Sequence, residues 1–134
     1  MILSLRTKMP GGIEYFLDSY ALIAILSGSE NYKKIDISKG ITTLVNLMEV
    51  QYYYHRKGAN NEKIKDTLNY MLPMCISYSP IDAFESVKFR FNRKKQKLSY
   101  VDCLGYTLAK KRGIDFVSGD MQFEDMDNVR FLKS

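Results

Sequence analysis

Two short apolar runs, each followed closely by an aspartate, constrain the fold of this chain most strongly. The first is IEYFL at 13–17, which leads directly into Asp18, and the second is IDFVS at 114–118, which leads through Gly119 to Asp120. Runs of this length without polar alternation are typical of strands buried on both faces, as in parallel sheets covered by helices. Both aspartates therefore occupy the position, just beyond a strand's carboxyl end, where open parallel sheets carry their sites.

Helical patterns separate these runs, and other strand-like segments lie between and after them. We predict strands at 13–17, 35–43, 74–79, 114–118 and 129–132, and helices at 19–27, 44–57, 61–72, 80–95 and 99–112. Strands that alternate with helices indicate an α/β fold with a mostly parallel sheet that is covered on both faces. Because Pro10-Gly11-Gly12 breaks regular structure, we treat residues 1–12 as an N-terminal extension.

The predicted helix at 44–57 carries an acid among apolar residues. On a helical wheel, Leu44, Val45, Met48 and Tyr52 fall on one side, and we expect that side to be buried. Glu49 lies at its rim. Because a buried, isolated carboxylate is costly, Glu49 is expected either to have a partner in the fold or to remain an exposed rim residue.

Length and composition narrow the class of protein. The 134 residues suit one domain, and the 46% of hydrophobic residues suffices for a core. Two cysteines, not arranged as CxxC, and a single histidine argue against zinc sites and disulfide frameworks. No leader peptide and no apolar stretch of 18 residues is found, so we expect a cytoplasmic protein without a membrane partner. The net charge of +5 favours anionic partners without proving one.

Several of the acids also have purely structural explanations. Asp18 suits the N-cap of the helix that follows it, and Asp120 suits a turn after Gly119. Ser99 and Asp102 match the S-x-x-[DE] capping pattern, with Asp102 at the third helical position. Capping and chemistry are compatible, because a carboxylate at the start of a helix also faces the end of the sheet from which the helix begins.

In chain order, three segments resemble the motifs of the PIN-domain family. FLDSYALIAIL resembles the first motif with Asp18 as its acid, and ITTLVNLMEVQYYY resembles the second with Glu49. The most specific stretch is LSYVDCLGYTLAKKRGIDFVSGDMQF, which resembles a third acid on a helix, Asp102, and a strand that ends in [ST]-x-[DN], here Ser118-Gly119-Asp120. The resemblance covers residues 13–132, although 55–95 carries no motif and the leader is longer than usual.

This resemblance implies a three-layer α/β/α sandwich with a mostly parallel sheet of about five strands. It implies that Asp18, Glu49, Asp102 and Asp120 meet in one acidic pocket and that the chain cleaves RNA with a divalent metal. It also implies the toxin component of a VapBC-type toxin–antitoxin pair, which forms a homodimer and is inhibited by a separate antitoxin protein.

Carboxylates suit hard cations such as Mg²⁺ or Mn²⁺. We expect Asp18 and Asp120 to be direct metal ligands, Asp102 to bind a second ion or act through water, and Glu49 to act through water or orient the nucleophile. Ser118 is a candidate for a hydrogen bond to a ligand carboxylate or a phosphate, or for a turn role. The basic segment 88–97, with Arg93, Lys94 and Lys95, is expected to follow the RNA backbone, the alternative being a solvated helix end.

The sequence motifs are also compatible with other functions. A stand-alone RNA-processing nuclease and a catalytically inactive RNA-binding module share the same motifs. A haloacid-dehalogenase-type phosphatase requires DxD after its first strand, whereas this chain has Asp18-Ser19-Tyr20. A receiver domain requires paired acids there, and these are also missing.

Overall fold

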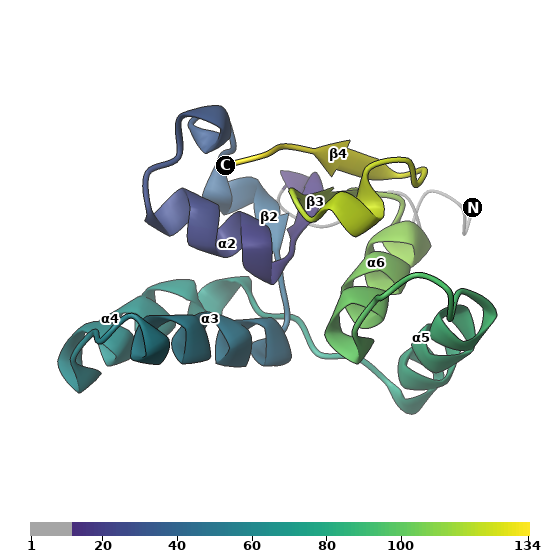
Figure 1. The fold of residues 1–134 in the computed structure, drawn as a ribbon, viewed down its shortest axis with the longest axis horizontal. Coiled ribbons are helices and arrows are strands. Elements are labelled where there is room, and N and C mark those ends of the chain that lie inside the picture. Colours follow the sequence, from purple (N-terminus) through teal and green to yellow (C-terminus); the bar gives the residue numbers. More distant parts are fainter. Residues whose placement is uncertain (1–11) are drawn as a thin grey trace.

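The computed structural model describes residues 12–134 (Figure 1). The extension predicted for residues 1–12 therefore lies outside the described residues except for Gly12. The regular elements, in chain order, are β1 (Tyr15–Leu17), α2 (Ser19–Leu26), β2 (Gly40–Ile41), α3 (Leu44–Arg56), α4 (Asn61–Met71), α5 (Pro80–Asn92), α6 (Tyr100–Arg112), β3 (Asp115–Ser118) and β4 (Val129–Phe131). Among these residues, no helix has both the length and the apolar character required to span a bilayer.

The sheet is parallel throughout, with the strand order β2-β1-β3-β4. It has four strands in the described part of the chain, where about five were expected. The prediction of a strand at 74–79 is wrong: Cys75 makes one isolated bridge to Thr42, and 77–79 is exposed. Because β2 is only two residues long, it offers too short an edge for a further strand to pair with.

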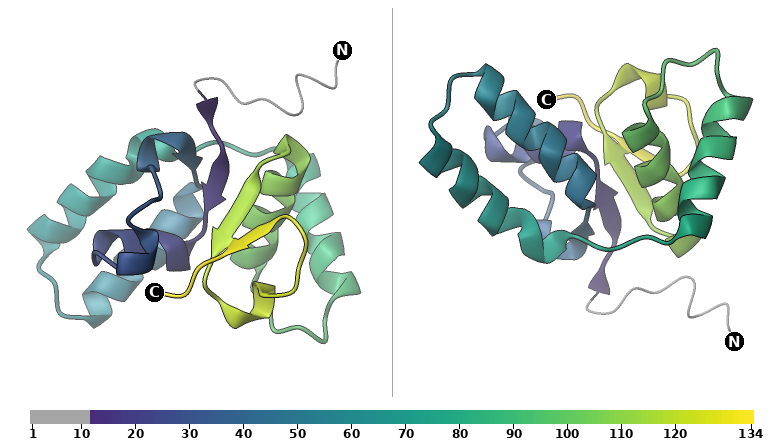
Figure 2. Two further views of the ribbon diagram at one scale, coloured as in Figure 1. Left: turned by 90° about the horizontal axis from the view of Figure 1, so that it is seen from above. Right: turned by 90° about the horizontal axis from the view of Figure 1, so that it is seen from below.

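Helices cover both faces of the sheet, as predicted. Side chains alternate across β1, so that Phe16 packs with Phe116 against α6 on one face. Tyr15 and Leu17 point to the other face, where α2 and α3 cover them. Figure 2 shows the strands between α2–α4 on one side and α5 and α6 on the other. The chain is therefore a three-layer α/β/α sandwich.

The ends of α6 follow the predicted signals. Ser99 is the N-cap, and its side chain and that of Asp102 form a reciprocal capping box. Gly113 ends the helix in the left-handed conformation at φ 68°, which glycine adopts without steric cost. The sequence therefore locates correctly the helix that carries Asp102.

The predicted buried face of α3 is wrong except at Val45, which is half-buried and packs against the core. Leu44, Met48 and Tyr52 are between 53% and 66% exposed. The helix buries Leu47 and Val50 instead, because its contacts with α2 and α4 lie on that side. The apolar side chains on the opposite side are left open at the surface.

Candidate functional site

Strand pairing places Asp18 beside Ser118. In the parallel register of β1 and β3, Leu17 lies opposite Val117, so the next residue along each strand is Asp18 and Ser118 respectively. Asp18 is buried, at 4% exposure, and its carboxylate accepts a hydrogen bond of 2.8 Å from the Ala21 N–H. The predicted N-cap role of Asp18 is thus confirmed, and the same carboxylate faces the carboxyl edge of the sheet.

Asp120 reaches this edge through a tight turn after β3. Its N–H donates to the Ser118 hydroxyl oxygen at 3.0 Å, and its carboxylate accepts from the Gln122 N–H at 3.0 Å. A side chain at Gly119 would collide with the Tyr20 ring and the Leu132 carbonyl, so only glycine fits between Ser118 and Asp120. The turn role predicted for Asp120 is confirmed and fixes the direction of its side chain.

Asp102 lies in the first turn of α6, half-buried. One carboxylate oxygen accepts a 2.8 Å hydrogen bond from the Ser99 N–H. The capping box therefore engages one oxygen and leaves the other to interact with further groups.

A polar chain inside the fold orients Glu49, which is exposed. The Ser19 hydroxyl donates to Glu49 Oε1 at 2.5 Å, and Asn46 Nδ2 donates to the Ser19 oxygen at 3.0 Å. The buried Asn46 in turn accepts from the Thr43 hydroxyl at 2.6 Å. Sequence reasoning missed Asn46, although a polar residue within LVNLM was a usable signal, since buried amides need partners.

Burial and neighbouring charges raise the pKa values of two of the four acids. Burial raises the pKa of Asp18 to about 7, and the nearby charges of Asp102 and Asp120 add to this, while hydrogen bonds from Ser118 and Ala21 oppose it. Burial also raises the pKa of Asp102, with further contributions from Asp120 and Glu49. None of the ion pairs among residues 12–134 involves these four acids. The edge thus concentrates negative charge.

The donors at this edge are of the kind that hard cations prefer, because all are oxygens. Nevertheless, no three acidic, histidine or cysteine side chains within 12–134 lie close enough to share one metal ion as they stand. The charges of the four acids influence one another at this edge, but within 12–134 the acids do not form a metal-binding group of the kind that the PIN resemblance implies. Mg²⁺ requires only one or two carboxylates, since waters complete its shell, so the donor set fits this cation.

The predicted basic run divides between two surfaces. Arg93 packs over the Phe89 ring at 4.7 Å and lines a hollow that also contains Lys110 and Lys111. Lys94 lines a different cavity, next to Ser99, and Lys95 is exposed and lines neither. Arg93 and Lys94 therefore face different hollows, and the role of Arg93, Lys94 and Lys95 in RNA binding stays a prediction.

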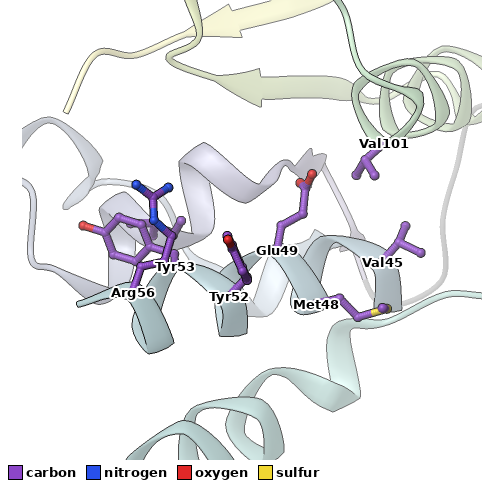
Figure 3. A pocket seen from close by; sticks show the side chains of 8 residues that line it. Val45, Met48, Glu49, Tyr52, Tyr53, Arg56 and Val101 are labelled. Atoms are coloured by element: carbon purple, nitrogen blue, oxygen red, sulfur yellow. The ribbon is translucent and has the colours of Figure 1, made fainter. Parts of the chain in front are cut away.

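An apolar groove adjoins the acidic edge (Figure 3). It has a volume of about 510 Å³ and is formed mainly by α3 with contributions from α2 and α6. Glu49 and Val101 lie toward one end, and Tyr53 and Arg56 lie toward the other. The exposed side of α3 that the sequence assigned to the core forms much of its wall, through Met48 and Tyr52.

Comparisons with known proteins agree with this architecture. A toxin–antitoxin complex from Klebsiella pneumoniae is similar, with a TM-score of 0.67, 20% identity and coverage of 87% of this chain and 96% of that chain. DNA-bound VapBC from Salmonella typhimurium has a TM-score of 0.68 at 20% identity, covering 89% and 96%. PAE2754 from Pyrobaculum aerophilum has a TM-score of 0.67 at 17% identity, covering 89% and 90%.

These three likenesses show a shared fold. A search of curated proteins gave no significant match. The sequence profile of the PIN domain family, however, matches residues 15–129, which contain β1, β2, β3, the first residue of β4 and all four acids. The chain belongs to the PIN domain family.

Proposed function

We propose that this chain is a divalent-metal-dependent ribonuclease and the toxin of a toxin–antitoxin pair. The observation that supports this most strongly is the buried Asp18 carboxylate, flanked by Asp102 and Asp120 at the carboxyl edge of the sheet, with its pKa raised to about 7. A buried acid that is ionised beside further acids is costly unless a cation binds there.

Asp18 and Asp120 would hold the ion, and Asp102 would contact it through water. Bound Mg²⁺ or Mn²⁺ supplies a more acidic water and stabilises charge that develops on the phosphate. Glu49, oriented by Ser19, is placed to position a water molecule or accept its proton. The Ser118 hydroxyl oxygen accepts a hydrogen bond from the Asp120 N–H, which fixes the turn. The same hydroxyl donates to the Asp18 carboxylate. We therefore assign Ser118 a positioning role.

Cleavage of labelled RNA by the purified chain tests this function. We expect cleavage with Mg²⁺ and with Mn²⁺, and none with EDTA. Cleavage that persists in EDTA would contradict metal dependence, and binding without cleavage under any of these conditions would favour an inactive RNA-binding module.

We assign the groove along α3 to an antitoxin. Glu49 belongs both to the groove and to the acidic edge, so a chain seated in the groove would restrict access to the site. Its walls are largely apolar. Single exposed apolar side chains are common on protein surfaces, but a continuous apolar groove indicates a binding surface. Two of the similar structures are described as a toxin–antitoxin complex and as VapBC, which supports this choice of partner.

Met48→Lys should weaken antitoxin binding by at least tenfold, because a charge would be buried in an apolar contact. Co-purification with the small protein encoded beside the gene measures this, and Tyr70→Lys, on the exposed surface of α4, is the matched control. RNA cleavage by Met48→Lys without the antitoxin should equal that of the wild type. If no small reading frame adjoins the gene, the chain is better explained as an RNA-processing nuclease.

A second apolar surface supports a homodimer. Ile81, Phe84, Val87 and Phe91 of α5 are each between 49% and 67% exposed, and their spacing places them along one side of the helix. This surface belongs to α5, which packs on α6 across the sheet from α3 and α4 (Figure 2).

Phe84→Lys should convert this dimer to a monomer at micromolar concentration, because the introduced charge loses its hydration in the interface. Analytical ultracentrifugation would show the change, and Tyr70→Lys should remain dimeric. A wild-type chain that sediments as a monomer at the same concentration would refute the dimer and leave the nuclease proposal intact.

A further inference from the structure

A second cavity lies beside the acidic edge, between the end of α5 and the start of α6. It has a volume of about 430 Å³. Its lining residues are Arg90, Lys94, Gln96, Lys97, Leu98 and Ser99. Three of these six carry positive charge, so the cavity has the character of an anion site rather than of an apolar pocket.

Arg90 is held in a fixed orientation within this cavity. Its Nε donates to the Leu98 carbonyl at 2.9 Å, and its guanidinium lies 4.4 Å from the centre of the Tyr100 ring. Because Nε is engaged, the two terminal nitrogens are left for a ligand, and such a planar fork matches the oxygens of a phosphate. An arginine ordered in advance loses less conformational entropy when it binds.

The cations of the cavity have no acidic partners within the described residues. None of the ion pairs found between 12 and 134 includes Arg90, Lys94 or Lys97. The cavity therefore gathers three positive charges that an anion would neutralise.

Ser99 connects this cavity to the acidic edge. It lines the cavity, and its N–H donates to the Asp102 carboxylate. A strand whose scissile phosphate lies at the acids would therefore pass a neighbouring phosphate over the cavity. Tyr100, at 62% exposure and stacked with Arg90, offers a face on which the adjoining base can stack.

We infer that this cavity binds a non-scissile phosphate of a single-stranded RNA substrate, with Tyr100 stacking the adjoining base. The inference rests on the proposed ribonuclease function and adds the direction in which the substrate leaves the acids. It also separates Lys94 from Arg93, which faces the hollow with Lys110 and Lys111. In this cavity, Arg90 and Lys97 accompany Lys94 in place of Arg93 and Lys95.

The test is the double variant Lys94→Gln with Lys97→Gln, since both side chains are exposed and neither holds the fold through an ion pair in the described structure. Its matched control is Lys63→Gln with Lys65→Gln, which removes the same charge from α4, at the other end of the molecule from α5 (Figure 1). Binding of labelled single-stranded RNA is measured in EDTA, with salt varied.

We expect the double variant to bind on the order of tenfold more weakly than the wild type at about 0.1 M salt. Its log–log salt slope should be shallower by about 0.7 for each lysine that contacts a phosphate. The control should lose little affinity. Equal losses in the two double variants would overturn the inference, because the effect would then come from net charge alone.

A scan with one neutral methylphosphonate per RNA locates the contact. In the wild type, neutralisation at one position a fixed distance from the cleavage position should weaken binding, and the double variant should be insensitive there. Equal sensitivity in both proteins would contradict the inference. A double variant that no longer binds the antitoxin but binds RNA as well as the wild type would also contradict it. If Asp120→Asn abolishes cleavage but keeps the wild-type pattern of methylphosphonate sensitivity, the acidic edge and the basic cavity are separate sites. Absence of cleavage in the wild type would refute the proposed function itself.

Discussion

Asp18→Asn should remove nearly all metal-dependent RNA cleavage, lowering the single-turnover rate by about a hundredfold or more. The substitution removes one charged oxygen donor from the buried centre of the acidic edge and leaves a neutral amide of the same shape. Asp120→Asn should act similarly, because that residue supplies the facing carboxylate beyond β3. The measurement is cleavage of labelled RNA under single-turnover conditions with Mg²⁺ and with Mn²⁺.

The fold should survive this change. Asn caps helices about as well as Asp, so the hydrogen bond from the Ala21 N–H is retained. Asp66→Asn, on the exposed surface of α4, is the matched control and should cleave at the wild-type rate. More than about a tenth of wild-type activity in Asp18→Asn or Asp120→Asn would rule out the proposed site.

The free energy of unfolding should fall as pH rises from about 4 to about 7 when EDTA is present. The pKa of Asp18 is raised in the folded protein from 3.8 to about 7, so the native state holds a proton that the unfolded chain releases. The stabilisation is complete below pH 4 and is lost through pH 7, with a slope approaching about 1.4 kcal/mol per pH unit. The raised pKa of Asp102 acts in the same direction.

Asp18→Asn should flatten this dependence and melt above the wild type in EDTA at pH 7, by an amount on the order of 1 kcal/mol. Its amide can also donate to the neighbouring carboxylates, which the ionised Asp18 repels. Millimolar Mn²⁺ should narrow or invert the difference, because the ion binds the native wild type and favours its ionised acids. A variant less stable than wild type in EDTA, with no Mn²⁺ shift in either protein, would leave capping as the only role of Asp18.

The sequence predicted the central fold because its signals are local. The apolar runs before Asp18 and Asp120, and the capping pattern at Ser99, each depend on a few consecutive residues. The strand predicted at 74–79 failed because strand formation requires a partner edge, and β2 ends after two residues. A segment's apolar composition alone does not reveal whether such an edge exists.

Tertiary contacts decided the remaining features. A helical wheel shows that α3 has apolar sides but does not show which one meets α2 and α4, so Met48 and Tyr52 were assigned to the core although they form the groove. The pairing of β1 with β3 places Ser118 beside Asp18, and no spacing in the sequence predicts that register. The consecutive Arg93 and Lys94 line different hollows, because the chain turns after α5 ends at Asn92.

The acids at the carboxyl edge of the sheet should together bind one divalent cation. Titration of Mn²⁺ into the full chain, followed by the loss of the free-ion paramagnetic resonance signal, tests this most directly. We expect saturable binding in the wild type and in the control Glu62→Gln, on the exposed start of α4, and at least tenfold weaker binding in Asp18→Asn and in Asp120→Asn. Binding that is equal in all four proteins, or absent from the wild type, would contradict the account.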